Sequence, residues 1–173
     1  MVHARVIMGV ACAGAALAAW TGSGAAATGA CAPSALAARM MVVRGSAGAG
    51  NISYRLVLRN TSTATCEVSG HPGLRLRGAG GRALPTHVTA VAPGAGTAAL
   101  IRLAPGQAAG AMLRFSPDVP GPGEQSTGRC EPVAHSVRVS LASPGSGALV
   151  GPVKPPTSVC EHGTMSEGLL TRL

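Results

Sequence analysis

The sequence predicts an all-β fold, an immunoglobulin-like β-sandwich of seven or eight short antiparallel strands stapled by two disulfides. From residue 31 onward, apolar residues alternate with polar ones in short runs, which is the pattern of half-buried strands. Glycine and proline separate these runs, as expected for turns. The same region holds an even set of four cysteines, which indicates two disulfides: Cys31, Cys66, Cys130 and Cys160.

The first thirty residues are expected to be a signal peptide rather than part of the fold. A short positive segment precedes residues 6–20, a charge-free apolar run shorter than the ~20 residues needed to span a bilayer. Ala25-Ala26-Ala27 offers a small-residue site, which predicts cleavage near Ala27 and a single secreted domain over residues 31–173. Two alternatives stay open: lipid attachment at Cys12, and retention of the apolar run as an anchor.

Four cysteines allow three connectivities. We expect neighbours in the sequence to pair, Cys31 with Cys66 and Cys130 with Cys160. No pair has the C-x-x-C spacing of a redox or zinc motif. Each disulfide would close a loop of about thirty residues and contribute roughly 3 to 4 kcal/mol in the chain-entropy model. That contribution matters because beyond residue 30 only Tyr54 and Phe115 are aromatic, so smaller side chains must fill the core.

Taken in order along the chain, strands are expected at 39–44, 51–60, 64–69, 74–77, 97–103, 107–116 and 136–142. The clearest is 51–60, where apolar and polar residues alternate without interruption. Pro105-Gly106 predicts a tight turn that joins 97–103 and 107–116 as a hairpin. Residues 116–128 and 143–156 are rich in proline and glycine and are expected to be connecting segments.

Residues 60–73 read N-T-S-T-A-T-C-E-V-S-G-H-P-G. This segment resembles the N-T-S-x-x-T-C-x-L-x-G-Y-P-G core of an exported actinobacterial family known as domain of unknown function 4232. The turn at 103–106, Cys130, the strand at 137–139 and Cys160 follow in the matching order. The resemblance implies a secreted or envelope-exposed β-sandwich with paired cysteines, and it transfers no catalytic residues. His71 stands where the family usually has tyrosine, and Phe115 where it often has tryptophan.

Signatures of catalysis and metal binding are absent from the sequence. The one aspartate beyond residue 30, Asp118, lies in a Pro/Gly loop, whereas a serine-hydrolase triad needs a carboxylate beside its histidine. The G-x-S-x-G motif is absent, and the histidines lack metal-site spacing. Cys160-Glu161-His162 would bind a metal only if Cys160 were reduced. We therefore expect no enzyme, no cofactor and no metal site; the shortage of aromatic residues also argues against nucleic acid as a partner.

Charge is the feature with a functional implication. From residue 31 onward there are thirteen basic and six acidic residues. Guanidinium groups bind phosphate and carboxylate bidentately, so arginines gathered on one face would suit an anionic polymer. The simpler alternative is a solvated surface that keeps the domain soluble. Seven arginines fall on outward strand positions and make up the predicted anion-binding face: Arg55, Arg59, Arg75, Arg77, Arg102, Arg114 and Arg138.

Together these features favour a secreted or cell-envelope interaction module whose partner is an anionic cell-wall polymer or an extracellular protein, with no transmembrane segment left after cleavage. The alternative function is a structural or inhibitor-like domain. Such a domain would present the Pro/Gly loops at 120–123 and 144–145 to a protein partner. An enzyme is the least favoured class.

Overall fold

The computed structural model describes residues 28–91, 98–125, 130, 132–142 and 147–173. The expected signal peptide up to Ala27, Cys12 and the loop at 144–145 lie outside these residues. The described chain forms three short 3-10 turns, η1 (Pro33–Ala35), η2 (Ala79–Gly81) and η3 (Glu161–Gly163), and these strands: β1 (Leu36–Val42), β2 (Ile52–Asn60), β3 (Cys66–Val68), β4 (Gly73–Arg77), β5 (His87–Ala90), β6 (Ile101–Leu103), β7 (Ala108–Phe115), β8 (Val133–Ser140), β9 (Ala148–Ser158), β10 (Thr164–Glu167) and β11 (Thr171–Arg172).

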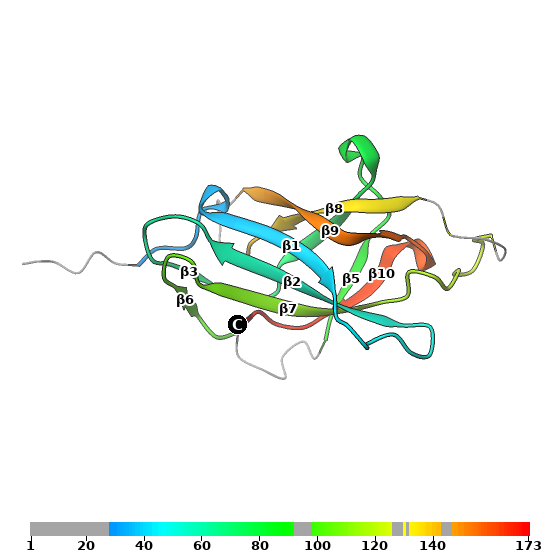
Figure 1. Cartoon of the computed structure of the whole chain (residues 1–173), viewed down its shortest axis with the longest axis horizontal. Helices are drawn as coiled ribbons and strands as arrows, with labels where there is room; N and C mark the ends of the chain where they lie inside the picture. Colours follow the sequence, from blue (N-terminus) through cyan, green and yellow to red (C-terminus); the bar gives the residue numbers. More distant parts are fainter. Residues whose placement is uncertain (1–27, 92–97, 126–129, 131, 143–146) are drawn as a thin grey trace, which may run out of the picture.

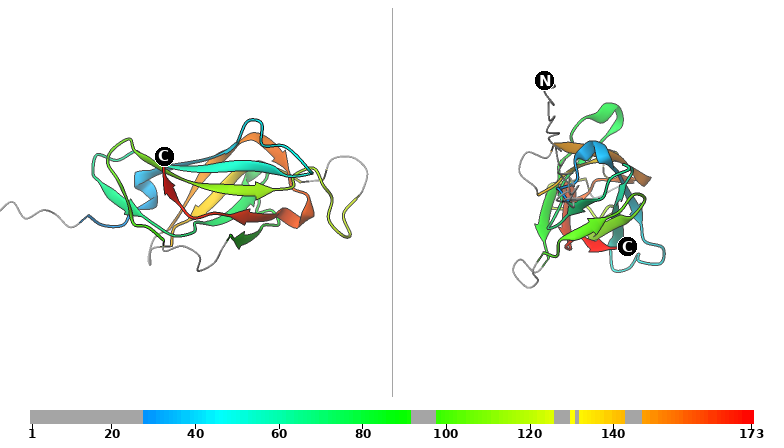
Figure 2. Two further views of the ribbon diagram at one scale, coloured as in Figure 1. Left: turned by 90° about the horizontal axis from the view of Figure 1, so that it is seen from below. Right: turned by 90° about the vertical axis from the view of Figure 1, so that its left-hand side faces the viewer.

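Nine of these strands form one mixed sheet in the order β4-β8-β9-β1-β2-β7-β10-β5, with β11 pairing to β7. β3 and β6 pair separately. The large sheet bends around the core (Figure 1), so that β2 and β7 lie on one side of it and β8 and β9 on the other (Figure 2). The all-β prediction is confirmed. The two halves of this bent sheet, which lie on opposite sides of the core, correspond to the two layers of the expected sandwich.

The strand pattern differs from the prediction in number and direction. Eleven strands are present among the described residues instead of seven or eight, and β1–β9 and β5–β10 are parallel pairs. The predicted hairpin is wrong. Gly106, with φ of 80°, does sit in a tight turn closed by a hydrogen bond from the Gln107 N–H to the Ala104 carbonyl. However, β6 pairs with β3 while β7 pairs with β2, so the turn connects two sheets.

β9 runs through the segment expected to be a Pro/Gly connection. It lies between β8 and β1 inside the large sheet, although it contains Pro152, Pro155 and Pro156. Pairing with β8 covers 148–152 and resumes at 157, with a register shift between Ala134 and Ser136. Pro155 and Pro156 therefore lie where β9 makes no pair with β8. A strand tolerates proline at such positions because no N–H is needed there for a ladder hydrogen bond.

Gly151 permits the close approach of β9 to β1. A Cβ atom placed on it would collide with the backbone carbonyl of Ala38, so any larger residue would push the strands apart. This contact brings the N-terminal strand of the domain against a strand more than a hundred residues later. Parallel pairing of Met40 with Val153 and of Met41 with Lys154 completes the junction.

Aliphatic side chains dominate the core, as the composition requires. Tyr54 and Phe115 are both buried, and their ring centroids lie 6.1 Å apart, within the range of favourable aromatic pairs. The Tyr54 hydroxyl is satisfied by Thr157 Oγ1 at 2.9 Å. The remaining fully buried large apolar side chains surround this pair: Met40, Leu56, Leu58, Leu76, Leu103, Leu113, Val137, Val139 and Val153.

Two disulfides join Cys31 to Cys66 and Cys130 to Cys160, the same pairs as expected from their order in the chain. Residues 28–30, which follow the expected cleavage site, continue along β3, where the Glu67 N–H donates to the Gly29 carbonyl. Among the described residues, no helix is long and apolar enough to cross a membrane.

Candidate functional site

The seven arginines of the predicted anion-binding face occupy three separate places. Arg55 and Arg59 on β2 and Arg114 on β7 project from neighbouring strands of the large sheet. Arg75, Arg77 and Arg138 lie on β4 and β8, at the other end of the strand order. Arg102 lies on the small β3–β6 sheet. The structure therefore divides the predicted face into two groups of three arginines and one separate arginine.

Arg39 on β1 joins the group on β2 and β7, although it was not among the seven predicted arginines. It projects to the exposed side, opposite Val57 of β2. Leu36, Ala38 and Met40 alternate with exposed residues. This alternation predicts that Arg39 points outward once the strand is taken to begin at residue 36 rather than 39. We use the term basic face for the exposed arginines of β1, β2 and β7: Arg39, Arg55, Arg59 and Arg114.

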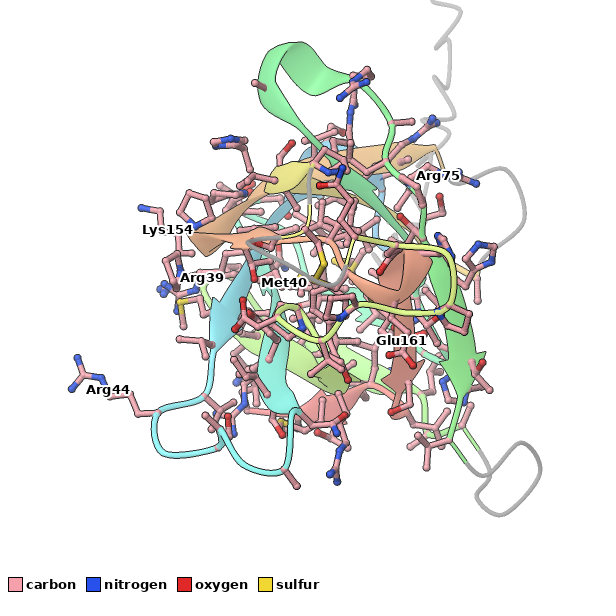
Figure 3. All side chains as sticks on the ribbon, turned by 90° about the vertical axis from the view of Figure 1, so that its right-hand side faces the viewer. Arg39, Met40, Arg44, Arg75, Lys154 and Glu161 are labelled. Atoms are coloured by element: carbon pink, nitrogen blue, oxygen red, sulfur yellow. A yellow bond between two sulfur atoms is a disulfide. The ribbon has the colours of Figure 1, made fainter. Side chains whose placement is uncertain are left out.

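The strands that carry the basic face, β1, β2 and β7, contain no acidic residue. Across the strands, Arg55 lies opposite Met41 and Met112, and Arg59 lies opposite Ala37 and Ala108. Within the part of the chain that the structure describes, none of the four guanidinium groups forms a hydrogen bond or an ion pair. Figure 3 shows Arg39 on the same side of the molecule as Lys154, with Arg75 on the other side.

Arg114 lines a polar hollow at one end of the basic face. The register aligns Ser53, Arg114, Ser166 and Thr89 in a row across β2, β7, β10 and β5. Arg114, Ser166 and Thr89 of this row line a groove with a volume of about 280 Å³. It presents one guanidinium among hydroxyl and amide groups that can donate to oxygen atoms; its other polar lining residues are Asn51, Ser116, Glu161 and Thr164.

A second, smaller hollow lies between Arg39 and Arg59. Its volume is about 160 Å³, and small apolar residues line it together with Val57. Although Val57 is on the outward side of β2, it is buried. A ligand at this point would contact an apolar floor between two cationic groups.

Two acidic side chains are neutralised or buried away from the basic face. Glu67 forms an ion pair with Arg102, with Oε1 and Nη2 3.1 Å apart, so Arg102 is the one predicted arginine with an acidic partner among the described residues. Glu167 is 2% exposed inside the core. Glu161 lines the Arg114 groove. Glu161 thus brings an acidic group to the groove of Arg114, although no ion pair joins the two among the described residues.

Comparison with known proteins assigns the fold to a family. The model of a domain of unknown function, DUF4232, matches residues 31–170. The chain belongs to the DUF4232 family. No curated protein and no solved structure matches it.

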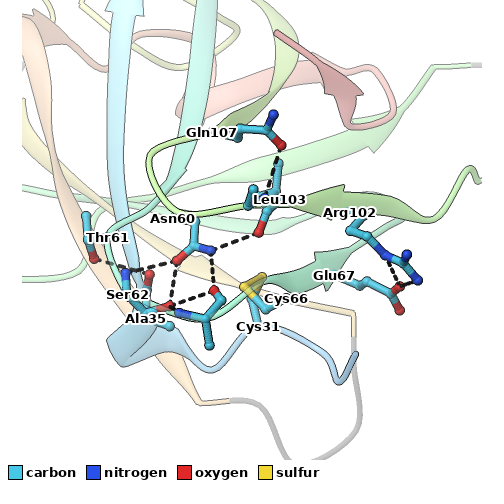
Figure 4. The surroundings of a disulfide bond; sticks show 12 residues. Cys31, Ala35, Asn60, Thr61, Ser62, Cys66, Glu67, Arg102, Leu103 and Gln107 are labelled. Carbon is cyan, nitrogen blue, oxygen red and sulfur yellow. Dashed lines mark hydrogen bonds and ion pairs between the residues drawn. A yellow bond between two sulfur atoms is a disulfide. The ribbon is translucent and has the colours of Figure 1, made fainter. Parts of the chain in front are cut away.

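The DUF4232 motif at 60–73 has a structural role in this chain. Asn60 is fully buried, and its Nδ2 donates to the carbonyls of Ala64 and Leu103 at 2.8 and 2.9 Å. Its Oδ1 accepts from the N–H and the hydroxyl of Ser62. Beside this network, Cys66 is joined to Cys31 (Figure 4). The motif thus fastens the end of β2 to the turn that links the two sheets.

The second disulfide of the DUF4232 domain lies beside Glu124. Glu124 Oε2 accepts the N–H groups of Gly121 and Glu161 at 2.8 and 2.6 Å, and Oε1 accepts the N–H of His162 at 2.8 Å. These backbone hydrogen bonds, led by those from Gly121 and His162, hold the pKa of the Glu124 carboxyl below its usual value. One side chain therefore ties the Pro/Gly loop at 120–123 to η3.

Glu124 and the sulfur atoms of Cys130 and Cys160 are the nearest approach to a metal-ligand cluster in the described chain, within 4.8 Å of one another. Thiolates, not disulfide sulfurs, bind metals, and these two sulfurs form a disulfide. The donor set consequently does not fit a metal while the disulfide is intact. The same bond occupies Cys160 of the Cys160-Glu161-His162 segment.

Proposed function

We propose that this DUF4232 domain is an exported interaction module that binds anionic polymers of the cell envelope through its basic face. The observation that carries the proposal is the group of four exposed arginines on three adjacent strands, without an acidic partner among the described residues. The apolar run and small-residue site near the start of the chain support export. The two disulfides support an oxidising compartment.

The spacing of the arginines suits an extended ligand. Arg55 and Arg59 are four residues apart on one strand, which places their Cα atoms about 13 Å apart at the usual rise of a β-strand. A small anion would reach one of them, whereas a polymer with repeated phosphate or carboxylate groups would reach several. Guanidinium groups bind both kinds of anion with paired hydrogen bonds.

The test is co-sedimentation of the disulfide-intact protein with purified cell wall. Arg55→Gln/Arg59→Gln removes two charges from the basic face, and Arg44→Gln/Arg82→Gln removes two exposed charges outside it as the matched control. Since each exposed charge contact is worth up to about 1 kcal/mol, we expect the first variant to bind roughly tenfold more weakly. The control should bind nearly as well as the unmodified protein.

Salt provides the second readout. Exposed charges are screened over about 8 Å at physiological ionic strength and over less at higher salt. A few hundred millimolar salt should therefore release the protein from the wall. Binding that resists salt, or that falls equally in the two double variants, would contradict recognition through the basic face.

The alternative function, binding a protein partner through Pro/Gly loops, is supported by one contact. Glu124 fastens the loop at 120–123 to η3, which gives that loop a defined shape. This alternative predicts a cross-linked species of fixed mass that is lost in Glu124→Ala and retained in the Arg55→Gln/Arg59→Gln variant.

A further inference from the structure

Arg75 and Arg138 face each other directly across the β4–β8 pair. The antiparallel register places Arg75 opposite Arg138, and both side chains are exposed. Like charges directly opposite on neighbouring strands destabilise a sheet. Neither guanidinium has a hydrogen-bonding or acidic partner in the described ranges, so nothing in the fold offsets their repulsion.

The next outward-facing pair of the register borders a hollow beside the two arginines. Gly73 lies opposite Ser140, and the hollow of about 320 Å³ is lined by these two residues together with Leu74 and both arginines. Because Gly73 has no side chain, the space over Ser140 stays open; a Cβ there would lie 3.5 Å from the Cβ of Ser140. A hydroxyl and two guanidiniums thus border one space with no carboxylate in its lining.

Arg77, the remaining cation of β4, is turned away from this hollow. It lies one outward position further along, opposite Ser136. Its Nε donates to the Gly81 carbonyl at 2.7 Å, which directs it toward η2. Arg75 and Arg138 therefore form a pair of their own and do not belong to a longer row of arginines.

We propose that Arg75, Arg138 and Ser140 form a binding site for a single phosphate group, separate from the basic face. Two guanidiniums supply paired N–H donors, and the Ser140 hydroxyl supplies a third direction of hydrogen bonding. A phosphate between the arginines would replace the repulsion of like charges with two attractions. The inference does not rest on polymer binding, because the two sites share no residue.

The experiment is a titration of the disulfide-intact protein with inorganic phosphate at constant ionic strength, followed by thermal melting and by NMR shifts of β4 and β8. Sodium chloride at matched ionic strength serves as the control for screening. We expect saturable binding that raises the melting temperature, with the largest shifts at Arg75, Arg138 and Ser140. Glycerol 3-phosphate is titrated in parallel, so that tighter binding of one probe shows whether the site prefers free phosphate or a phosphate ester.

Arg138→Gln separates a built site from general attraction of anions. Without phosphate it should melt at a higher temperature than the unmodified protein, since the repulsion is relieved. It should also bind phosphate roughly tenfold more weakly, because hydrogen bonds to charged groups are the stronger class. Arg55→Gln, which removes the same charge from the basic face, should leave phosphate affinity unchanged while weakening wall binding.

Three results would overturn the proposal: non-saturable shifts with both probes, equal phosphate affinity in Arg138→Gln and Arg55→Gln, or a lower melting temperature for Arg138→Gln at low salt without phosphate. If the unmodified protein bound phosphate saturably but did not bind cell wall, only the polymer proposal would be contradicted. The two failures are therefore distinguishable with the same set of variants.

Discussion

Glu167 is an acidic side chain placed in an apolar interior. It ends β10 and is 2% exposed, and its Oε1 has no hydrogen-bond partner among the described residues. Burial disfavours the charged form and raises the pKa of Glu167 to about 8. At neutral pH the folded protein therefore keeps this carboxyl largely protonated, whereas the unfolded chain releases the proton.

The Glu167 pKa predicts a stability that falls as pH rises. Between its ordinary pKa near 4.5 and the folded value of about 8, the folded state binds more protons than the unfolded one. Stability from this group is thus full at acidic pH and decreases across that window by up to about 1.4 kcal/mol per pH unit. Glu167→Gln should remove the decrease and melt higher than the unmodified protein at pH 8. Melting curves from pH 5 to 8.5 that coincide for the two proteins would contradict this.

Glu124 has the opposite dependence on pH. Its folded pKa is lowered, so the stability it contributes is present above its ordinary pKa and is lost as pH falls through the lowered value. Glu124→Ala should abolish this loss and free three backbone N–H groups, those of Gly121, Glu161 and His162. We expect faster amide hydrogen exchange at these three positions, with β2 and β7 as internal controls. Unchanged exchange would show that Glu124 does not hold the loop.

At the scale of elements, alternation identified the strands whose two faces differ. β2 and β7 were found within one residue because their apolar residues repeat at every second position. β9 was not predicted because prolines in a sequence are typical of turns. Its place inside the sheet depends on the register shift of β8, which the sequence pattern does not reveal. β5 and β10 are four residues each and are defined by pairing with each other. The hairpin was wrong because a turn motif does not specify which sheet its flanking strands join.

The same limit applies to the candidate site. Alternation along each strand predicted that the seven arginines point outward, and the structure leaves them exposed or half-buried. Arg55, Arg75 and Arg138 are examples of exposed ones. Their grouping depends on strand order, which pairs β4 with β8 and places both far from β2. Local alternation carries no information about that order. The opposition of Arg75 and Arg138 therefore appears only in the structure.

The stability of the turn at the end of β2 depends on one buried side chain, that of Asn60. Asn60→Ala would leave the carbonyls of Ala64 and Leu103 without their donor in a buried site. Each buried unsatisfied group costs about 1 to 3 kcal/mol, so we expect a loss of roughly 2 to 4 kcal/mol in the free energy of unfolding, measured by denaturant titration. Thr61→Ala, which loses an exposed hydrogen bond to Ala35, is the adjacent control and should cost much less. Equal effects of the two substitutions would contradict the role of the Asn60 amide.

At the scale of the whole molecule, the disulfides compensate for a core with two aromatic rings. They span 35 and 30 residues, and each is worth roughly 3 to 4 kcal/mol in the chain-entropy model. Reduction of both should lower the melting temperature by more than about 10 °C in a domain of this size. The double replacements Cys31→Ser/Cys66→Ser and Cys130→Ser/Cys160→Ser should each produce part of the loss. A melting temperature unaffected by reductant would show that packing alone is sufficient.

The position of β1 between β2 and β9 also governs how the chain reaches its native state. β1 pairs with β2, which follows it closely in the sequence, but its other edge requires residues 148–158. Pairing across so long a separation in sequence slows folding, and an open strand edge invites association with other chains. The domain should therefore acquire protease resistance only when β9 is present, and a chain truncated before residue 148 should aggregate.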